Sequence, residues 1–292
     1  MVGKQWARRL ARAAGFDVVR TSRHPQEVPP ELLRDPIAAV HIARGRVRTA
    51  FTCPLELARD RQGFSFGASG WHPLVATASA LREAEAGSDD STLTRYFDVF
   101  RPRTALEALP GFEALDPCVL DELPPHLFGL TPWYPSSIER LDDEVRHWTA
   151  TDAEEHGLTT YDLDVHGVAY FGPASALVLD LEEHRLATLN AALRKHGFDR
   201  SHGDPRFYLV RRGREFRAVS SGGGRHRVAV MSAQGHRWVP ATFDQPVAVD
   251  VRDVADWPQV RAGRWSERDA LRYVDHLFDF DTHEWARQRQ LT

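Results

Sequence analysis

Residues 219–241 read Val-Ser-Ser-Gly-Gly-Gly-Arg-His-Arg-Val-Ala-Val-Met-Ser-Ala-Gln-Gly-His-Arg-Trp-Val-Pro-Ala, the pattern of a strand, a glycine turn, a helix and a second strand. Glycines let the backbone approach a ligand closely and point successive N–H groups toward it. The helix N-terminus adds about half a positive charge, and an arginine side chain can donate two hydrogen bonds to phosphate oxygens. A purely structural turn is the alternative, because glycines are common between a strand and a helix. The pattern predicts a phosphate-binding turn made of Ser220, Ser221, Gly222, Gly223, Gly224, Arg225, His226 and Arg227.

The rest of the C-terminal half alternates strands and helices irregularly. Leu186, Leu189 and Leu193 recur on one face of a helix predicted from about 181 to 196, which ends at Gly197. A last helix is expected to begin at Ser266, where Ser-Glu-Arg-Asp is close to a capping box. This irregular order is typical of an α+β domain. We expect strands at 168–171, 176–179, 207–210, 215–219 and 238–243, with 207–210 and 215–219 forming a hairpin, and a helix from 225 to about 234.

Two blocks of the chain resemble the ParB/sulfiredoxin superfamily. The first is Glu182-Glu183-His184-Arg185-Leu186, which leads into the helix that ends at Gly197; the second is the glycine turn with its helix and the Val239-Pro240 strand. The match covers roughly residues 168–245. The resemblance implies a small mixed sheet with flanking helices. It also implies that the turn binds the phosphates of ATP or ADP, with CTP as another candidate, together with Mg²⁺.

The same resemblance implies roles for particular residues. In the superfamily's free serine kinases a glutamate of the first helix is the general base, a role that falls here to Glu182 or Glu183, with His226 as the third catalytic candidate. The aspartate of the kinase turn is replaced here by Gly223. Sulfiredoxins carry their catalytic cysteine where this chain has Arg225, which excludes sulfinic acid reduction. Read without the resemblance, the two glutamates are expected at a helix start, where the helix dipole favours negative charge.

Composition narrows the classes of function. Only Lys4 and Lys195 are lysines among the 37 basic residues, so a phosphate-binding P-loop has no lysine in the required place. With Cys53 and Cys118 alone, a disulfide framework is excluded, and a reducing cytoplasm is the expected location. The net charge of −4 argues against bulk nucleic-acid binding. Residues 185–237, however, hold 12 Lys/Arg against three acids, a local balance of +9 that favours a polyanionic ligand or a solvated arginine face.

The N-terminal half, residues 1–160, is interpreted as an α/β extension rich in loops that shapes a substrate pocket or an interaction surface, and residues 161–292 as the ParB/sulfiredoxin-like domain. Within the extension we expect a basic amphipathic helix at 4–15, which offers weak peripheral contact with a membrane, a hairpin at 37–52 and helices at 73–86 and 91–100. No run of about 20 apolar residues is present to span a membrane. Residues 101–140 are expected to wrap around the core, anchored by Trp133 and Tyr134.

A separate cluster could bind a metal ion. Asp162, Asp164 and His166 alternate and would share one face of a strand. The solvent-exposed face of an edge strand would show the same spacing.

These observations lead to two hypotheses. The favoured one is an enzyme that transfers a phosphoryl group from ATP or ADP to the hydroxyl of a small-molecule acceptor. The alternative is a non-catalytic module that senses a nucleotide or binds nucleic acid.

Overall fold

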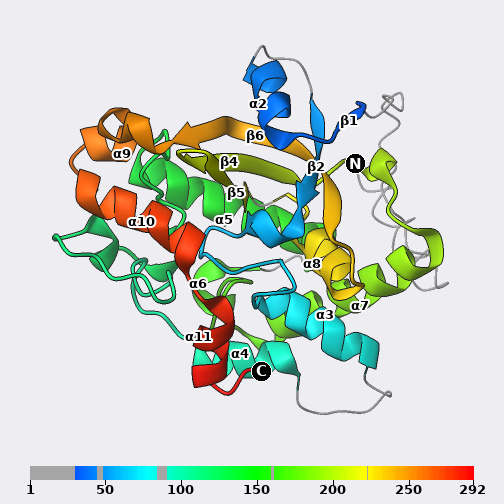
Figure 1. Cartoon of the computed structure of the whole chain (residues 1–292). Helices are drawn as coiled ribbons and strands as arrows, with labels where there is room; N and C mark the ends of the chain where they lie inside the picture. Colours follow the sequence, from blue (N-terminus) through cyan, green and yellow to red (C-terminus); the bar gives the residue numbers. More distant parts are fainter. Residues whose placement is uncertain (1–29, 45–48, 84–90, 159–160, 222) are drawn as a thin grey trace, which may run out of the picture.

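The computed structural model describes residues 30–44, 49–83, 91–158, 161–221 and 223–292 (Figure 1). These residues form a mixed α+β fold with one six-stranded sheet in the order β1-β2-β6-β4-β5-β3. The strands are β1 Leu32–Leu33, β2 Ala50–Pro54, β3 Ala58–Arg59, β4 Arg206–Arg212, β5 Glu215–Ser220 and β6 Trp238–Asp250. The helices are α2 Pro36–Arg44, α3 Pro73–Glu83, α4 Thr92–Val99, α5 Ile138–Glu155, α6 Leu163–His166, α7 Ala176–His196, α8 Arg225–Ala233, α9 Pro258–Arg261, α10 Glu267–Asp279 and α11 Thr282–Gln288.

The sheet joins both halves of the chain. Strand β4 forms the predicted antiparallel hairpin with β5 and also pairs with β6 in parallel, while β2 pairs with β6 and β3 with β5. The boundary expected near residue 160 therefore separates segments that share one sheet. Helices α3, α4, α7 and α8 lie together on one side of the sheet in Figure 1, and α2 lies near β1 and β2.

The parallel pairing of β4 with β6 is interrupted by a bulge. Phe207 pairs with Phe243 and Leu209 with Ala248, so Tyr208 faces the four residues 244–247 of β6 without regular pairing. Bulges bend a strand and redirect its side chains. This irregularity falls at the centre of the sheet and places Tyr208 and residues 244–246 at the wall of a cavity.

The segment 101–137, which precedes α5, has little regular structure but is well packed. Trp133 is buried and lies edge-on to Tyr208 and Trp257, which confirms its predicted role as an anchor. The buried carboxylate of Asp269, in the first turn of α10, accepts hydrogen bonds from the backbone amides of Leu115 at 2.8 Å and Asp116 at 3.0 Å. This segment is therefore fixed to the C-terminal helices rather than loosely wrapped.

The strand predictions at 37–52, 168–171 and 176–179 are wrong. The expected hairpin at 37–52 is instead helix α2 followed by β2, because Pro36 occupies the first helical position and Ala39, Val40 and Ala43 form one buried face. The expected strands at 168–171 and 176–179 are a turn region and the first turn of α7. Short apolar runs fit a buried helix as well as a strand, so the pattern alone does not separate them.

Several helix predictions agree with the structure. Ser266 caps α10 through its side-chain oxygen, as predicted, and Ser91 caps α4 in the same way. The predicted helix at 4–15, and with it the membrane contact through residues 1–15, lies outside the described residues. Within the described part of the chain, no helix is long and apolar enough to cross a bilayer.

We predict that Asp269→Ala lowers the free energy of unfolding by about 2 kcal/mol, because two backbone N–H groups lose their acceptor. Urea denaturation measures the change. Arg268→Ala is the control, since this neighbouring side chain is exposed and its loss is expected to change stability by less than about 0.5 kcal/mol. Equal stability of the Asp269→Ala and wild-type proteins would show that the segment is held by its aromatic contacts alone.

Candidate functional site

The predicted phosphate-binding turn lies between β5 and α8, and it is tied to the start of β4. Gly224 has a φ of +90° and precedes α8, and a Cβ atom there would lie 2.9 Å from the Cα of Pro205. The amide of Arg206 donates to the carbonyl of Gly223 at 3.0 Å, and the amide of Ser221 donates to the carbonyl of Arg206 at 3.1 Å. Glycine is therefore required at 224 by both backbone conformation and space. Gly222 lies outside the described residues.

The N-terminus of α8 has no side-chain cap. Its N-cap residue is Gly224, which offers no oxygen to the first-turn amides. In the described part of the chain, no side chain accepts a hydrogen bond from the amides of residues 223–227. The positive end of this helix is therefore not compensated by a capping side chain.

Glu182 lies at the centre of a buried ionic cluster. Its Oε2 atom is 2.6 Å from Nε2 of His226 and 3.3 Å from Nη2 of Arg225, and its Oε1 atom is 2.9 Å from Nη1 of Arg185. Arg185 also pairs with Asp152 of α5 at 2.8 Å. Only 1% of the Glu182 side chain is exposed. The cluster connects α7 to α8 and α5.

The cluster fixes the charge of its members. Burial alone would raise the pKa of Glu182, but His226, Arg225 and Arg185 outweigh it and lower the pKa to about 2. Burial lowers the pKa of His226, with Glu182 acting in the opposite direction. At neutral pH, Glu182 is an ionised acceptor held by donors on three sides, and such a carboxylate is a poor proton acceptor.

The two candidate glutamates differ in their surroundings. Both lie in the middle of α7, which begins at Ala176, so the expected position at a helix start is wrong. Glu183 is half-buried, and its side chain makes no hydrogen bond or ion pair with the described residues. Neither glutamate lines the cavity described below, and neither does His226.

The two arginines of the turn point to different places. Arg225 donates to the carbonyl of Ala169 at 2.8 Å, and its guanidinium lies 4.0 Å from the ring centre of Tyr170. Arg227 donates to the carbonyl of Gly203 and lies over the ring of Phe198. Ser220 is buried at the end of β5. Of the predicted binding residues, Ser221 and Arg225 reach the cavity.

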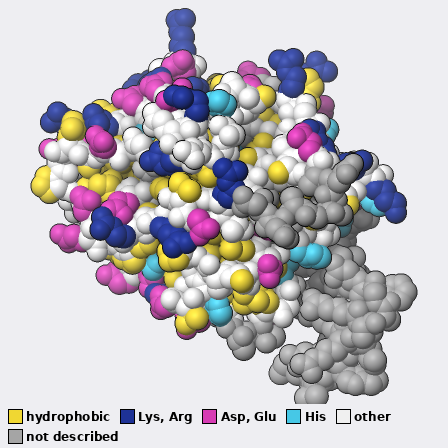
Figure 2. Space-filling view, turned by 90° about the horizontal axis from the view of Figure 1, so that it is seen from below, with side chains coloured by type: hydrophobic (Ala, Val, Ile, Leu, Met, Phe, Trp, Pro, Cys, Tyr) yellow, Lys and Arg dark blue, Asp and Glu magenta, His cyan; other side chains and the backbone are white. Residues whose placement is uncertain are grey.

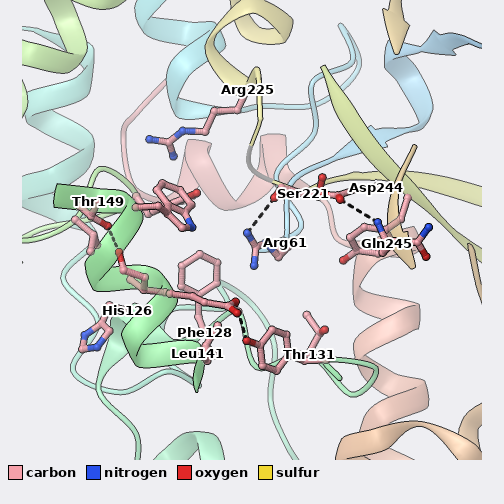
Figure 3. A pocket seen from close by; sticks show the side chains of 18 of the residues that line it. Arg61, His126, Phe128, Thr131, Leu141, Thr149, Ser221, Arg225, Asp244 and Gln245 are labelled. Carbon is pink, nitrogen blue, oxygen red and sulfur yellow. Dashed lines mark hydrogen bonds between the residues drawn. The ribbon is translucent and has the colours of Figure 1, made fainter. Parts of the chain in front are cut away.

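A cavity of about 310 Å³ lies beside this turn (Figure 3). Its walls come from the segment 126–135, helix α5, residues 168–170, strand β4 and the bulge of β6. Its aromatic lining is formed by Phe128, Trp133, Tyr134, Trp148, Tyr170 and Tyr208. Apolar walls with a few polar groups are typical of small-molecule sites.

Arg61 is a cavity residue that the sequence did not reveal. The carboxylate of Asp60 accepts the amides of Gln62 and Phe64, each at 2.9 Å, and the hydroxyl of Tyr273 donates to the Arg61 carbonyl at 2.6 Å. The backbone is thereby held while the half-buried guanidinium points into the cavity, 3.4 Å from the carbonyl of Ser221 (Figure 3). No carboxylate of the described residues forms an ion pair with it. One arginine among 35 carries no distinguishing sequence signal.

Tyr208 brings a second unusual group to the same cavity. It is 4% exposed, its ring lies edge-on to that of Trp133, and its hydroxyl oxygen is enclosed by the protein. Burial raises the pKa of Tyr208 to about 12, although the charge of Arg61 acts to lower it. The hydroxyl is therefore protonated at neutral pH.

The acidic residues of the cavity are paired to different degrees. Glu144 pairs with Arg140 at 2.7 Å, and Asp152 pairs with Arg185 at 2.8 Å. Asp244 forms an ion pair only with Arg206, at 3.9 Å, and its Oδ1 atom accepts the amide of Gln245 at 2.9 Å; its side chain is 30% exposed. Asp244 is therefore the cavity carboxylate with the weakest ion pair among the three.

The fold neutralises the basic segment 185–237 in part. The excess of +9 is counted over residues 185–237 alone. Most of the acidic residues that form ion pairs with this segment lie elsewhere in the chain. Figure 2 shows basic side chains interspersed with acidic ones on the face in view. The arginines of this segment with ion pairs are Arg185, Arg200, Arg206, Arg211, Arg212 and Arg225.

The alternative metal cluster does not form. Asp162 caps the short helix α6, so the predicted strand at 162–166 is wrong. Asp164 pairs instead with Arg146 at 2.9 Å. The described residues contain no group of three His, Cys, Asp or Glu side chains placed to hold a metal ion.

We predict that Glu182→Gln lowers the free energy of unfolding at pH 7 by about 3 kcal/mol, because Arg185 and Arg225 lose their buried counter-charge. The folded-state pKa lies below the ordinary value of 4.5, so this stabilisation is present above pH 4.5 and is lost as the pH falls toward 2.

Urea denaturation between pH 7 and pH 2.5 should therefore show the gap between wild type and Glu182→Gln narrowing with acid. Glu183→Gln, one position along the same helix, serves as the control and should change stability by less than about 0.5 kcal/mol. A gap that stays constant with pH would contradict the assignment.

Comparison with protein-family models, curated proteins and solved structures yields no match to this chain.

Proposed function

We propose that this protein binds a nucleoside phosphate in the cavity between α5 and the bulge of β6. The observation that carries the proposal is Arg61, a half-buried guanidinium that points into an aromatic-lined cavity and has no carboxylate partner among the described residues. A cation that is partly withdrawn from water is stabilised by a nearby anion, and a bound phosphate would supply one. The similarity of the turn to the ParB/sulfiredoxin superfamily supports the same class of ligand.

Other cavity residues suit such a ligand. Ser221 offers a hydroxyl, and Arg225 a guanidinium partly compensated by Glu182. The lining also offers the rings of Trp148 and Tyr170 for stacking on a base. A volume of about 310 Å³ lies at the lower end of the range for small-ligand sites.

The reaction class we propose is phosphoryl transfer from ATP or ADP to a hydroxyl of a small acceptor. The acceptor oxygen would bond to the terminal phosphorus, the bridging oxygen would leave with the nucleotide, and a carboxylate would take the hydroxyl proton. Asp244 suits the role of base or Mg²⁺ ligand better than Glu182, because it lines the cavity and is only weakly paired. Glu182 then has a positioning role, in that it holds Arg225 and His226.

Isothermal titration calorimetry with ATP, ADP and CTP tests the binding. We predict that Arg61→Gln weakens the affinity for the nucleotide that binds by about 10- to 100-fold, as expected for a lost hydrogen bond to a charged group. The matched control is Arg214→Gln, since this exposed turn residue is not among those that line the cavity, and the variant should bind as wild type does. No binding by the wild-type protein, or undiminished binding by Arg61→Gln, would defeat the proposal.

Phosphorus NMR with ATP, Mg²⁺ and a panel of hydroxyl compounds tests the reaction. Asp244→Asn should lower turnover by at least about 100-fold while leaving nucleotide affinity within a few fold, since a general base acts on the transition state. Glu183→Gln is the control, because the half-buried side chain of Glu183 has no ion pair and does not line the cavity. Its turnover should equal that of wild type. Full turnover by Asp244→Asn would show that Asp244 takes no part in the reaction.

A further inference from the structure

We propose that an acidic groove beside the first cavity binds hydroxyl compounds that carry a positively charged nitrogen, and that such compounds are the acceptors of the transfer. This inference rests on the proposed function, because it names the class of the second substrate. The groove has a volume of about 540 Å³ and shares Trp133, Pro135, Gln245 and Pro246 with the first cavity. Asp244, the proposed base, immediately precedes Gln245 of this shared wall. The groove therefore adjoins the site of the proposed chemistry.

The acidic wall of the groove follows from the way β6 ends. Strand β6 ends at Asp250 and is followed by the 3₁₀-helix η5, Val251–Asp256. Because a 3₁₀-helix has about three residues per turn, the spacing of Asp250, Asp253 and Asp256 brings their side chains to one face. All three residues line the groove. The chain thus concentrates carboxylates on one wall.

Two of these carboxylates have no ion-pair partner in the described part of the chain. Asp250 is paired with Arg252 at 2.7 Å and with Arg211 at 3.7 Å. Asp253 and Asp256 are exposed, and no ion pair joins either of them to a described residue. The described residues that line the groove include no lysine, arginine or histidine. The groove therefore attracts cations and disfavours the anions that suit the first cavity.

The groove also presents a hydrogen-bond donor without an acceptor. Trp257 lines the groove and is 5% exposed, and its indole N–H donates to no acceptor among the described residues. The N–H groups of Trp71 and Trp285 are enclosed by the protein, whereas that of Trp257 is not. An unpartnered donor on a side chain so deeply buried calls for an explanation such as an absent ligand. Because the indole N–H only donates, its partner must be an acceptor atom, such as an oxygen of the ligand.

The ligand class follows from these groups together. A positively charged nitrogen is attracted by Asp253 and Asp256, and the indole rings and prolines of the lining suit the methyl or methylene groups attached to it. An oxygen of the same compound can accept the Trp257 N–H. A hydroxy acid would bring a carboxylate against the aspartates, and a neutral alcohol would gain nothing from their charge. Amino alcohols therefore fit the groove best.

Calorimetry without nucleotide tests the charge requirement, with choline and 3,3-dimethylbutan-1-ol as the probes. The two alcohols have the same shape, but a carbon atom replaces the charged nitrogen in the second. Wild type should bind choline at least about tenfold more tightly than the uncharged probe, because only choline interacts with the aspartates through a full charge.

The double variant Asp253→Asn/Asp256→Asn should lose this preference. Its affinity for choline should fall by at least about fivefold, while its affinity for the uncharged probe stays the same. Both side chains are exposed, so its melting temperature should match that of wild type. Asp143→Asn/Asp180→Asn is the matched control, since it removes the same charge from exposed residues that line neither site. This control should bind both probes as wild type does.

The outcomes separate the two proposals. If choline binds no more tightly than the uncharged probe, or if the double variant keeps the preference, this inference is wrong, while nucleotide binding is still decided by the Arg61→Gln titrations. If the preference depends on the two aspartates but no nucleotide binds, the cation site stands and the acceptor role fails together with the proposed function. Phosphorylation of the uncharged probe as fast as choline, measured by phosphorus NMR, would also overturn the inference.

Discussion

The carboxylate of Glu182 determines how the site is assembled. It joins the middle of α7 to the first turn of α8 through Arg225 and His226, and Arg185 extends the connection to α5. A carboxylate that is 1% exposed would be strongly destabilising without these partners. The direction in which Arg225 leaves the helix, and hence its position over Tyr170 at the cavity, follows from this cluster. Tertiary contacts therefore orient the turn that its glycines make possible.

The cavity itself results from a defect in the sheet. Between two paired positions, β4 contributes only Tyr208 while β6 contributes residues 244–247, so the two strands separate locally. Proline at 246 cannot donate to a ladder, which suits it to such a bulge. The opening is covered by Trp133 and the segment around it.

Sequence patterns predicted the helices and turns that are determined by neighbouring residues. The Arg212-Gly213 hairpin, the helix after the glycine turn and the serine cap at 266 all follow from turn and capping residues. The strand predictions for 37–52 and 168–179 are wrong because alternating or short apolar runs fit a helix face as well as a strand. Ser221 and Arg225 were found through the turn, but Arg61 lies 160 positions away from Ser221, and only the fold brings the two together. Ion pairs with acids elsewhere in the chain likewise offset part of the basic excess that the sequence count indicated.

The charges near the cavity show why one arginine dominates its electrostatics. Arg225 shares the buried charge of Glu182, and the carboxylates of Glu144 and Asp152 are occupied by arginines of their own. Asp244 is only weakly paired, at 3.9 Å from Arg206, and the positive charge of Arg61 has no ion-pair partner among the described residues. Since Coulomb interactions strengthen as the effective dielectric falls, that single charge acts more strongly here than on an open surface. The anion affinity of the cavity should therefore depend on Arg61 more than on the glycine turn, of which only Ser221 and Arg225 line the cavity.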